Sequence, residues 1–339
     1  MSPESLEAYC SGFRRALDPW PLLPLPAKPE LAWWQQLIGN DLQGSVQGSA
    51  LVAALQTAMP QLLMPQVVGI SGSELYRAAV LRGNHPDNPE LQGAAHQIGP
   101  MPHWQQPEAL QLRIAPHPCG AMPVLETPNR PDFELLVRAL AHRCEPVTLT
   151  GGVHAQAITG LIHWGLIRQC DRQSRASLIV LHQAPYGSVE HEQVPGGLSA
   201  AAWLEASTRL RLEHELTHLA TKRLLEEMRI NLLDELVADC MGMVVALGHF
   251  DAGLFGRCLG VDEHDQPIPE GRWLNYTRGL SDADTRAAIV LVMARAHEVE
   301  ASLQQQPALL EPAQAMVRLQ WLCQQRLDVP ISAAPASQH

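Results

Sequence analysis

Residues 214–218 read His-Glu-Leu-Thr-His, inside a stretch (residues 199–228) that contains neither glycine nor proline. Leucines recur through this stretch, which predicts one long helix over its whole length. Residues four positions apart lie on the same face of a helix, so His214 and His218 present their imidazoles to one point. Glu215 lies about 100° further round the helix, within reach of a water molecule bound to a metal at that point.

The next predicted helix, residues 232–247, combines an apolar sequence with a polar stripe. Asn231, Glu235 and Asp239 recur at intervals of four residues. Buried carboxylates are costly unless they are paired, and two histidines with a divalent cation would pair them. Glu235 therefore completes a three-ligand set with the two motif histidines and leaves a fourth position for water. We expect Asp239 and Asn231, one turn to either side of Glu235, to support the ligands through hydrogen bonds.

Two other interpretations of these segments remain open. The histidines of an isolated motif can lie on an ordinary amphipathic helix, and a polar stripe can be the solvated face of a surface helix. The motif and the stripe occur together and in the order that a metal site requires, which favours the metal site. Ala238 and Gly242 lie beside the stripe and are small enough for the two helices to approach closely.

Together the two segments, residues 199–242, resemble the gluzincin branch of zinc metallopeptidases. In that branch the two motif histidines and the first carboxylate of the following helix bind zinc. The resemblance implies one zinc ion per chain, held by His214, His218 and Glu235. It also implies that Glu215 is the general base of peptide hydrolysis and that Asp239 supports a ligand histidine. The substrate implied is a peptide or protein.

A second branch of the zinc peptidases is disfavoured. Metzincins carry the longer pattern H-E-x-x-H-x-x-G-x-x-H, and this chain has Thr221 and Leu224 where that pattern needs glycine and the third histidine. Some membrane-associated gluzincins share the E-x-x-x-D form of the second helix. This chain has no run of about 18 apolar residues with which to cross a bilayer.

Hydrolysis also needs a donor that stabilises the developing oxyanion. Tyr276 and Arg278 follow the two helices, while Tyr186, His182 and His191 precede them. We favour Tyr276 as the catalytic donor. The alternative for each of these residues is that it packs in the core or lies on the surface without a catalytic role.

The remaining chain indicates a predominantly helical α+β fold: a zincin-like metallopeptidase domain at residues 126–339, with a small β-sheet, and a helical and loop-rich N-terminal region of unknown role at residues 1–125. Further helices are expected over residues 31–38, 50–63, 73–81, 131–142, 282–303 and 312–327. Residues 83–131 are rich in glycine, proline, asparagine and histidine, which predicts long loops. Residues 146–150 and 176–183 are the β-strand candidates. The second is either an edge strand that aligns a peptide or an internal core strand.

Composition excludes several classes of function. With 46% hydrophobic and 17% charged residues, the 339-residue chain can build a sizeable core. Its formal net charge of −11 argues against a general nucleic-acid-binding surface, which needs clustered basic residues. The seven cysteines contain no Cys-x-x-Cys pair, which excludes a thiolate zinc finger. The start of the chain lacks the pattern of a signal peptide, so we expect a soluble, cytoplasmic protein with no membrane partner.

The sequence thus favours an active zinc-dependent peptidase. The alternatives are a catalytically inactive zincin-like scaffold, which binds metal or a protein partner, and a helical interaction protein whose histidines bind nothing. An intact Glu215 favours the peptidase, because a purely structural metal site has no use for a general base.

Overall fold

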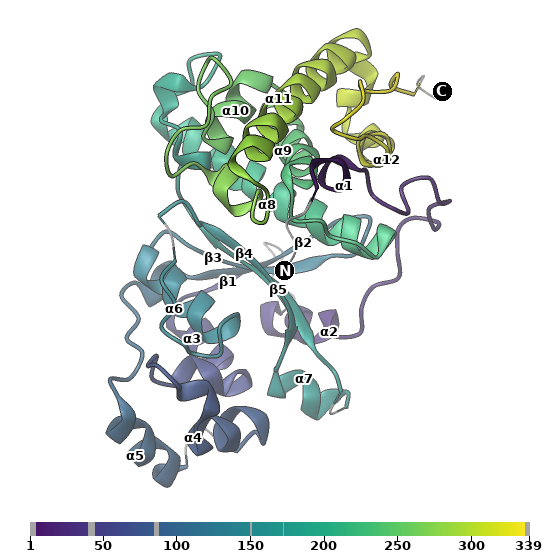
Figure 1. Ribbon diagram of the computed structural model, residues 1–339. Coiled ribbons are helices and arrows are strands. Elements are labelled where there is room, and N and C mark those ends of the chain that lie inside the picture. Colours follow the sequence, from purple (N-terminus) through teal and green to yellow (C-terminus); the bar gives the residue numbers. More distant parts are fainter. Residues whose placement is uncertain (1–4, 40–44, 85–87, 150, 172, 336–339) are drawn as a thin grey trace. The chain divides into compact units, whose positions relative to one another are not determined.

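The structure is a computed structural model that describes residues 5–39, 45–84, 88–149, 151–171 and 173–335 (Figure 1). The chain forms two compact units, which we call the helical unit (residues 1–22 and 184–339) and the sheet unit (residues 23–183). The predicted boundary between residues 125 and 126 is therefore wrong. It falls inside strand β3 (Met122–Thr127), whose backbone hydrogen bonds join it to the strands on both sides.

The sheet unit contains a mixed five-stranded sheet in the order β1-β2-β3-β5-β4. Neighbouring strands are antiparallel except β3 and β5, which run parallel. Strand β5 is buried along its whole length and lies between β3 and β4. The prediction of a strand at residues 176–183 is confirmed as an internal core strand, and the edge-strand alternative is wrong. The strands are β1 (Ser45–Gln47), β2 (Gln111–Ala115), β3, β4 (Ala155–Leu161) and β5 (Ala176–His182).

Two predictions about this sheet are corrected. Residues 83–131 contain helix α5 (Pro89–Ile98) and strands β2 and β3 as well as loops, and Pro123 is compatible with β3 because the pairing with β5 begins only at Val124. Residues 146–149 form no strand. Instead, the Val147 carbonyl accepts a hydrogen bond from the Arg138 side chain at 2.9 Å. Residue 150, the last of that candidate, lies outside the described residues. Local sequence could not reveal the pairing of β3 with β5, which joins Val124 to Ile179, 55 positions further along the chain.

The helices of the sheet unit pack around a core shared with the sheet. Proline ends one predicted helix early: residues 50–63 form α3 and then, from Pro60, a 3₁₀ turn. The predicted segment at residues 73–81 begins as α4 and continues as a π-helical turn over Arg77–Leu81. The helices are α2 (Leu31–Ile38), α3 (Gly48–Ala58), α4 (Glu74–Tyr76), α5 (Pro89–Ile98), α6 (Arg130–Leu140) and α7 (Trp164–Gln169).

The helical unit is built on α8 and α9, as the sequence predicts. Its helices are α1 (Leu6–Cys10), α8 (Ala200–Leu225), α9 (Leu232–Leu247), α10 (Ala252–Leu259), α11 (Asp282–Gln305) and α12 (Ala315–Cys323). The N-terminal segment belongs to this unit because the Tyr9 hydroxyl accepts a hydrogen bond from Leu232 N and donates one to the Tyr276 carbonyl. Among the described residues no single helix has both the length and the hydropathy of a membrane span. One bent pair, α9 with α10, reaches both only when its helices are combined.

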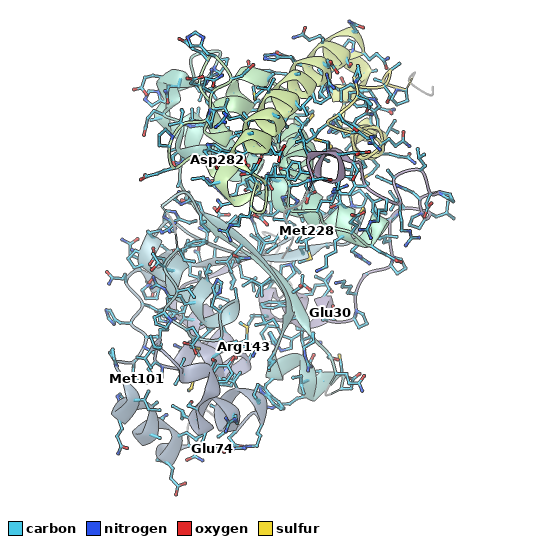
Figure 2. The ribbon with its side chains drawn as sticks, viewed as in Figure 1. Glu30, Glu74, Met101, Arg143, Met228 and Asp282 are labelled. Atoms are coloured by element: carbon cyan, nitrogen blue, oxygen red, sulfur yellow. The ribbon has the colours of Figure 1, made fainter. Side chains whose placement is uncertain are left out.

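Helices α8 and α9 run antiparallel and lie in close contact. Helix α8 ends at Leu225, and the chain reverses through a turn that contains Met228, labelled in Figure 2. A Cβ atom at Gly242 would lie 2.7 Å from the carbonyl oxygen of Leu210, so only glycine permits this approach. The antiparallel arrangement pairs the first two turns of α9 with the histidines of α8, which positions the candidate site.

Candidate metal centre

The two motif histidines point away from solvent and toward α9. His214 is 6% exposed, and its Nδ1 lies 2.6 Å from the Asp239 carboxylate. His218 Nδ1 lies 3.3 Å from an oxygen of Asp234. Each imidazole therefore has a carboxylate at its outer nitrogen, which fixes the ring orientation and leaves Nε2 as the free ligand atom. Asp239 lies where the sequence predicts it.

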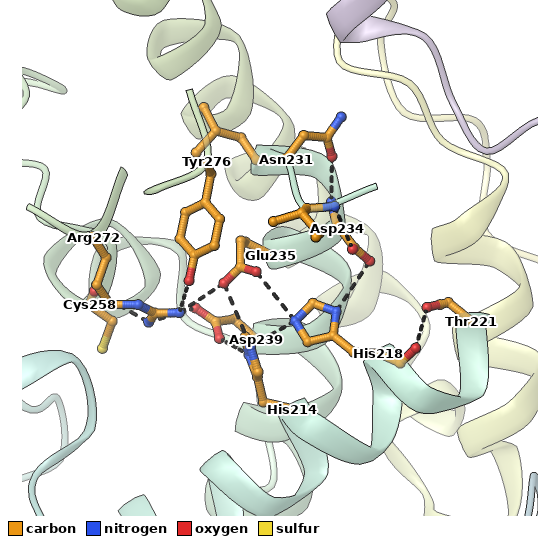
Figure 3. Close-up of polar contacts among 12 residues, drawn as sticks. His214, His218, Thr221, Asn231, Asp234, Glu235, Asp239, Cys258, Arg272 and Tyr276 are labelled. Atoms are coloured by element: carbon orange, nitrogen blue, oxygen red, sulfur yellow. Dashed lines mark hydrogen bonds and ion pairs between the residues drawn. The ribbon is translucent and has the colours of Figure 1, made fainter. Parts of the chain in front are cut away.

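The free ligand atoms converge on one point (Figure 3). The two Nε2 atoms are 2.9 Å apart, and the Glu235 carboxylate lies 3.3 Å from His218 Nε2 and 3.6 Å from His214 Nε2. Nitrogen and oxygen ligands of one tetrahedral zinc ion are about 3.3 Å apart, given metal–ligand bonds of about 2.0–2.1 Å. Two imidazoles and a carboxylate are also ordinary zinc ligands. The residues present thus fit a zinc ion, and these three form a group that can hold a metal ion.

The net charge of the cluster also favours a divalent cation at this point. Asp234, Glu235 and Asp239 are all at most 2% exposed, and the guanidinium of Arg272 pairs with two of them, Glu235 and Asp239. With neutral imidazoles, these four groups leave two negative charges uncompensated. Buried charges of this kind need partners, and a divalent cation carries the charge that the cluster lacks.

The pKa values reflect this pairing. Burial raises the pKa of the Glu235 carboxyl, but the neighbouring imidazoles and Arg272 outweigh it and hold the pKa below the usual value. Burial likewise raises the pKa of Asp239, and Arg272 and His214 outweigh it. For His218, burial lowers the pKa, while Asp234 and Glu235 raise it well above the ordinary value. In the metal-free protein, a proton on His218 would therefore supply positive charge to the neighbouring carboxylates.

One predicted supporting residue has a different role. Asn231 is the N-cap of α9: its side-chain oxygen accepts a hydrogen bond from Asp234 N, and its amide donates to the Tyr9 carbonyl. Its side chain is committed to the helix end, so the expectation that Asn231 supports a metal ligand is wrong. Asp234 occupies that place instead, with a carboxylate oxygen 3.3 Å from His218 Nδ1, and the sequence did not indicate it. In an antiparallel pair, one turn forward along α8 lies beside one turn back along α9. Because His218 follows His214 by one turn, its carboxylate partner is expected about one turn before Asp239, where Asp234 stands.

Arg272 and Tyr276 complete the surroundings of Glu235. They come from the 3₁₀ turn Arg272–Asn275 (η7) and the residue after it. Arg272 Nη2 donates to Glu235 at 2.9 Å and to the Tyr276 hydroxyl at 3.4 Å. Figure 3 shows both residues on the side of Glu235 away from His218. The structure thus brings Tyr276 to the site, whereas no motif in the sequence indicated Arg272.

Glu215 lies beside His214 on α8 and is partly exposed. Among the residues that the structure describes, its carboxylate has no hydrogen-bond partner of its own. A carboxylate that is next to a candidate ligand histidine and has no hydrogen-bond partner is available to accept a proton from water. Its position is compatible with the predicted role of general base.

The other candidate donors lie elsewhere. Arg278 is exposed, His182 belongs to the sheet unit, and His191 contacts the Leu198 carbonyl at 3.2 Å. Tyr186 is buried behind the imidazole of His214, where its hydroxyl lies 3.0 Å from Nδ1. Burial raises the pKa of this phenol well above its usual value, so the hydroxyl remains a proton donor.

Comparison with known protein families gives one match. The model of DUF7005, described as a family of unknown function, matches residues 5–177 and 171–332. No curated protein matches the chain, and no solved structure matches it.

Proposed function

The chain belongs to the DUF7005 family, and we propose that it is a zinc-dependent peptidase, with His214, His218 and Glu235 as the metal ligands and Glu215 as the general base. The observation that carries the proposal is the convergence of two Nε2 atoms and one carboxylate, each held by a further buried side chain. Peptides or proteins are the substrates in this proposal, and the acidic net charge argues against nucleic acid.

The chemistry divides between the metal and the protein. Zinc in this position would act as a Lewis acid that acidifies water and polarises the scissile carbonyl. Glu215 accepts the proton of the attacking water and returns it to the leaving amine as the C–N bond breaks. The Tyr276 hydroxyl donates a hydrogen bond to the oxygen that gains negative charge. Arg272 holds Glu235 in place, so that this carboxylate keeps its orientation toward both histidines.

A catalytically inactive, metal-binding scaffold is the second candidate. The contact that favours it is the ion pair of Arg272 with Glu235, at 2.9 Å. A largely buried guanidinium on a ligand carboxylate offsets charge and stabilises a closed site, which suits a structural metal. The two functions differ in their need for Glu215, because only hydrolysis requires a proton acceptor.

Hydrolysis of a quenched fluorescent peptide library separates the two candidates. The wild-type protein should cleave members of the library, and the variant Glu215→Gln should lose at least about 100-fold in rate, the lower part of the range for general acid–base catalysis. The matched control is Glu213→Gln, the same change two residues earlier on α8. Equal zinc content in wild type and Glu215→Gln, with no cleavage by either, would favour the scaffold.

A further inference from the structure

Tyr186 lies behind the metal centre, and its hydroxyl meets both members of the His214–Asp239 pair. We propose that Tyr186 is a positioning residue: it holds Asp239 in the orientation that accepts the Nδ1 proton of His214, and so it aims Nε2 of His214 at the metal. This inference rests on the proposed metal site and extends it to a residue outside both helices.

The contacts define a triangle on the outer side of the imidazole. The Tyr186 hydroxyl donates to Asp239 Oδ1 and lies 3.0 Å from His214 Nδ1. The same Oδ1 atom is 2.6 Å from Nδ1. Nδ1 and Nε2 lie on different sides of the ring, so the hydroxyl is remote from the point where the ligand atoms converge. Tyr186 therefore acts on the metal centre through its neighbours.

The chain around Tyr186 is tied to α8, the helix that carries His214. Tyr186 N donates to Ser207 Oγ at 2.9 Å. Arg211 Nη2 donates to the carbonyls of Ala184 and Pro185, at 3.1 and 3.2 Å. These hydrogen bonds hold the backbone of residues 184–186 against α8, and they therefore fix the hydroxyl relative to the imidazole.

The ring and the following residue are also held. The Tyr186 ring lies against two guanidinium groups, with Cζ of Arg272 at 5.0 Å and Cζ of Arg211 at 5.4 Å from its centroid. Gly187 has φ +60°, and a Cβ there would lie 2.5 Å from the Cα of Cys258 on α10. Tyr186 therefore has little freedom to move away from Asp239.

Asp239 depends on this hydroxyl. The carboxylate is fully buried, and besides His214 and Tyr186 its charged neighbour is Arg272, whose Nη1 is 3.6 Å from Oδ2. Without the hydroxyl, Oδ1 keeps only the imidazole, and the carboxylate is free to turn toward the guanidinium. The hydrogen bond that orients His214 then weakens. Loss of a partner that orients a metal ligand costs about 10–100-fold in metal affinity.

The test is Tyr186→Phe, which removes the hydroxyl and keeps the ring between the guanidiniums. We expect its zinc affinity, measured by competition with a chelator, to fall about 10-fold, the low end of that range because Tyr186 acts through Asp239. The visible absorption spectrum of the cobalt(II)-substituted variant should also change. Tyr76→Phe is the matched control, since Tyr76 is a buried tyrosine of the sheet unit. It should alter neither quantity.

A second variant keeps the inference testable if Tyr186→Phe does not fold. Ser207→Ala releases the Tyr186 backbone without touching the phenol, and we expect a smaller decrease in zinc affinity. Wild-type zinc affinity and an unchanged cobalt spectrum in Tyr186→Phe would overturn the inference while the proposed metal site stood.

A measurement without metal separates the two proposals. In the metal-free protein the Nδ1 proton of His214 should give a slowly exchanging NMR signal that is lost in Tyr186→Phe. If the wild-type protein binds no zinc, the proposed function fails, and this signal still decides whether Tyr186 holds His214. A signal that persists unchanged in the variant would contradict that role.

Discussion

At the scale of single residues, each proposed ligand histidine has a carboxylate at its outer nitrogen, which orients the ring. Asp239 serves His214 and Asp234 serves His218, and both acids are 0% exposed. An amide in place of either carboxylate keeps the volume but removes the charge that favours the Nδ1–H tautomer. The imidazole then loses both orientation and basicity at Nε2.

Asp234→Asn should therefore lower zinc affinity by about 10–100-fold, measured by chelator competition at fixed pH. The control is Asp251→Asn in the same unit: Asp251 caps α10 through a hydrogen bond from Leu254 N, and asparagine caps a helix equally well. An affinity of Asp234→Asn equal to that of the control would show that His218 needs no partner.

A second residue-scale prediction concerns His163 in the sheet unit. It is 0% exposed, packs against the ring of Trp33 at 4.2 Å, and caps α7 through a hydrogen bond from Leu166 N to Nδ1. Burial lowers its pKa from 6.5 to about 4. Below pH 6.5 the unfolded chain binds a proton that the folded chain does not. The free energy of unfolding should thus fall as the pH drops toward 4, by up to about 1.4 kcal/mol per pH unit from this group.

The variant His163→Asn isolates this contribution, because asparagine retains the cap and does not titrate. Denaturant unfolding between pH 7 and 4.5 should show a steeper loss of stability in wild type than in the variant. Parallel pH profiles would mean that His163 titrates normally in the folded protein.

At the scale of elements, sequence patterns located the helices better than the strands. The bounds of α2 and α9 agree with the prediction, and Ser281 caps α11 as its acidic first turn indicates. Apolar periodicity and capping residues are local signals, so they are visible in one stretch of chain. Strands β2 and β4 carry proline or glycine at or near their ends, and their stability comes from pairing with other strands, which their own residues do not reveal.

The same contrast applies to the candidate site. Helix spacing predicted His214, His218, Glu235 and Asp239 as one group, and the structure brings them together. Arg272 and Tyr186 come from short 3₁₀ turns outside α8 and α9, and their contacts depend on how those segments fold back on the two helices. No spacing rule relates such residues to the motif.

The approach of α8 to α9 gives a prediction at this scale. Gly242→Ala places a methyl group 2.7 Å from the Leu210 carbonyl oxygen, so the helices must separate. Overpacking of this kind costs about 1–3 kcal/mol of unfolding free energy. In Gly93→Ala the same change falls in α5, where a Cβ meets nothing within 4 Å, and should stabilise by about 0.4–1 kcal/mol. Thermal or denaturant unfolding measures both, and equal effects would contradict the close approach.

At the scale of the whole molecule, the proposed metal ligands, their supporting acids and the proposed general base all belong to the helical unit. The chain enters this unit twice, through residues 1–22 and again from residue 184. A division of the chain into consecutive domains could not reveal this, because the contact of Tyr9 with Leu232 joins residues 223 positions apart.

We propose that the helical unit holds one zinc ion, and the metal content of the purified protein is the decisive measurement. Elemental mass spectrometry should find one zinc per chain in the wild-type protein and none in the double variant His214→Ala/His218→Ala, with circular dichroism confirming that the variant is folded. A wild-type protein that contains no zinc, and takes up none on reconstitution, would contradict the account.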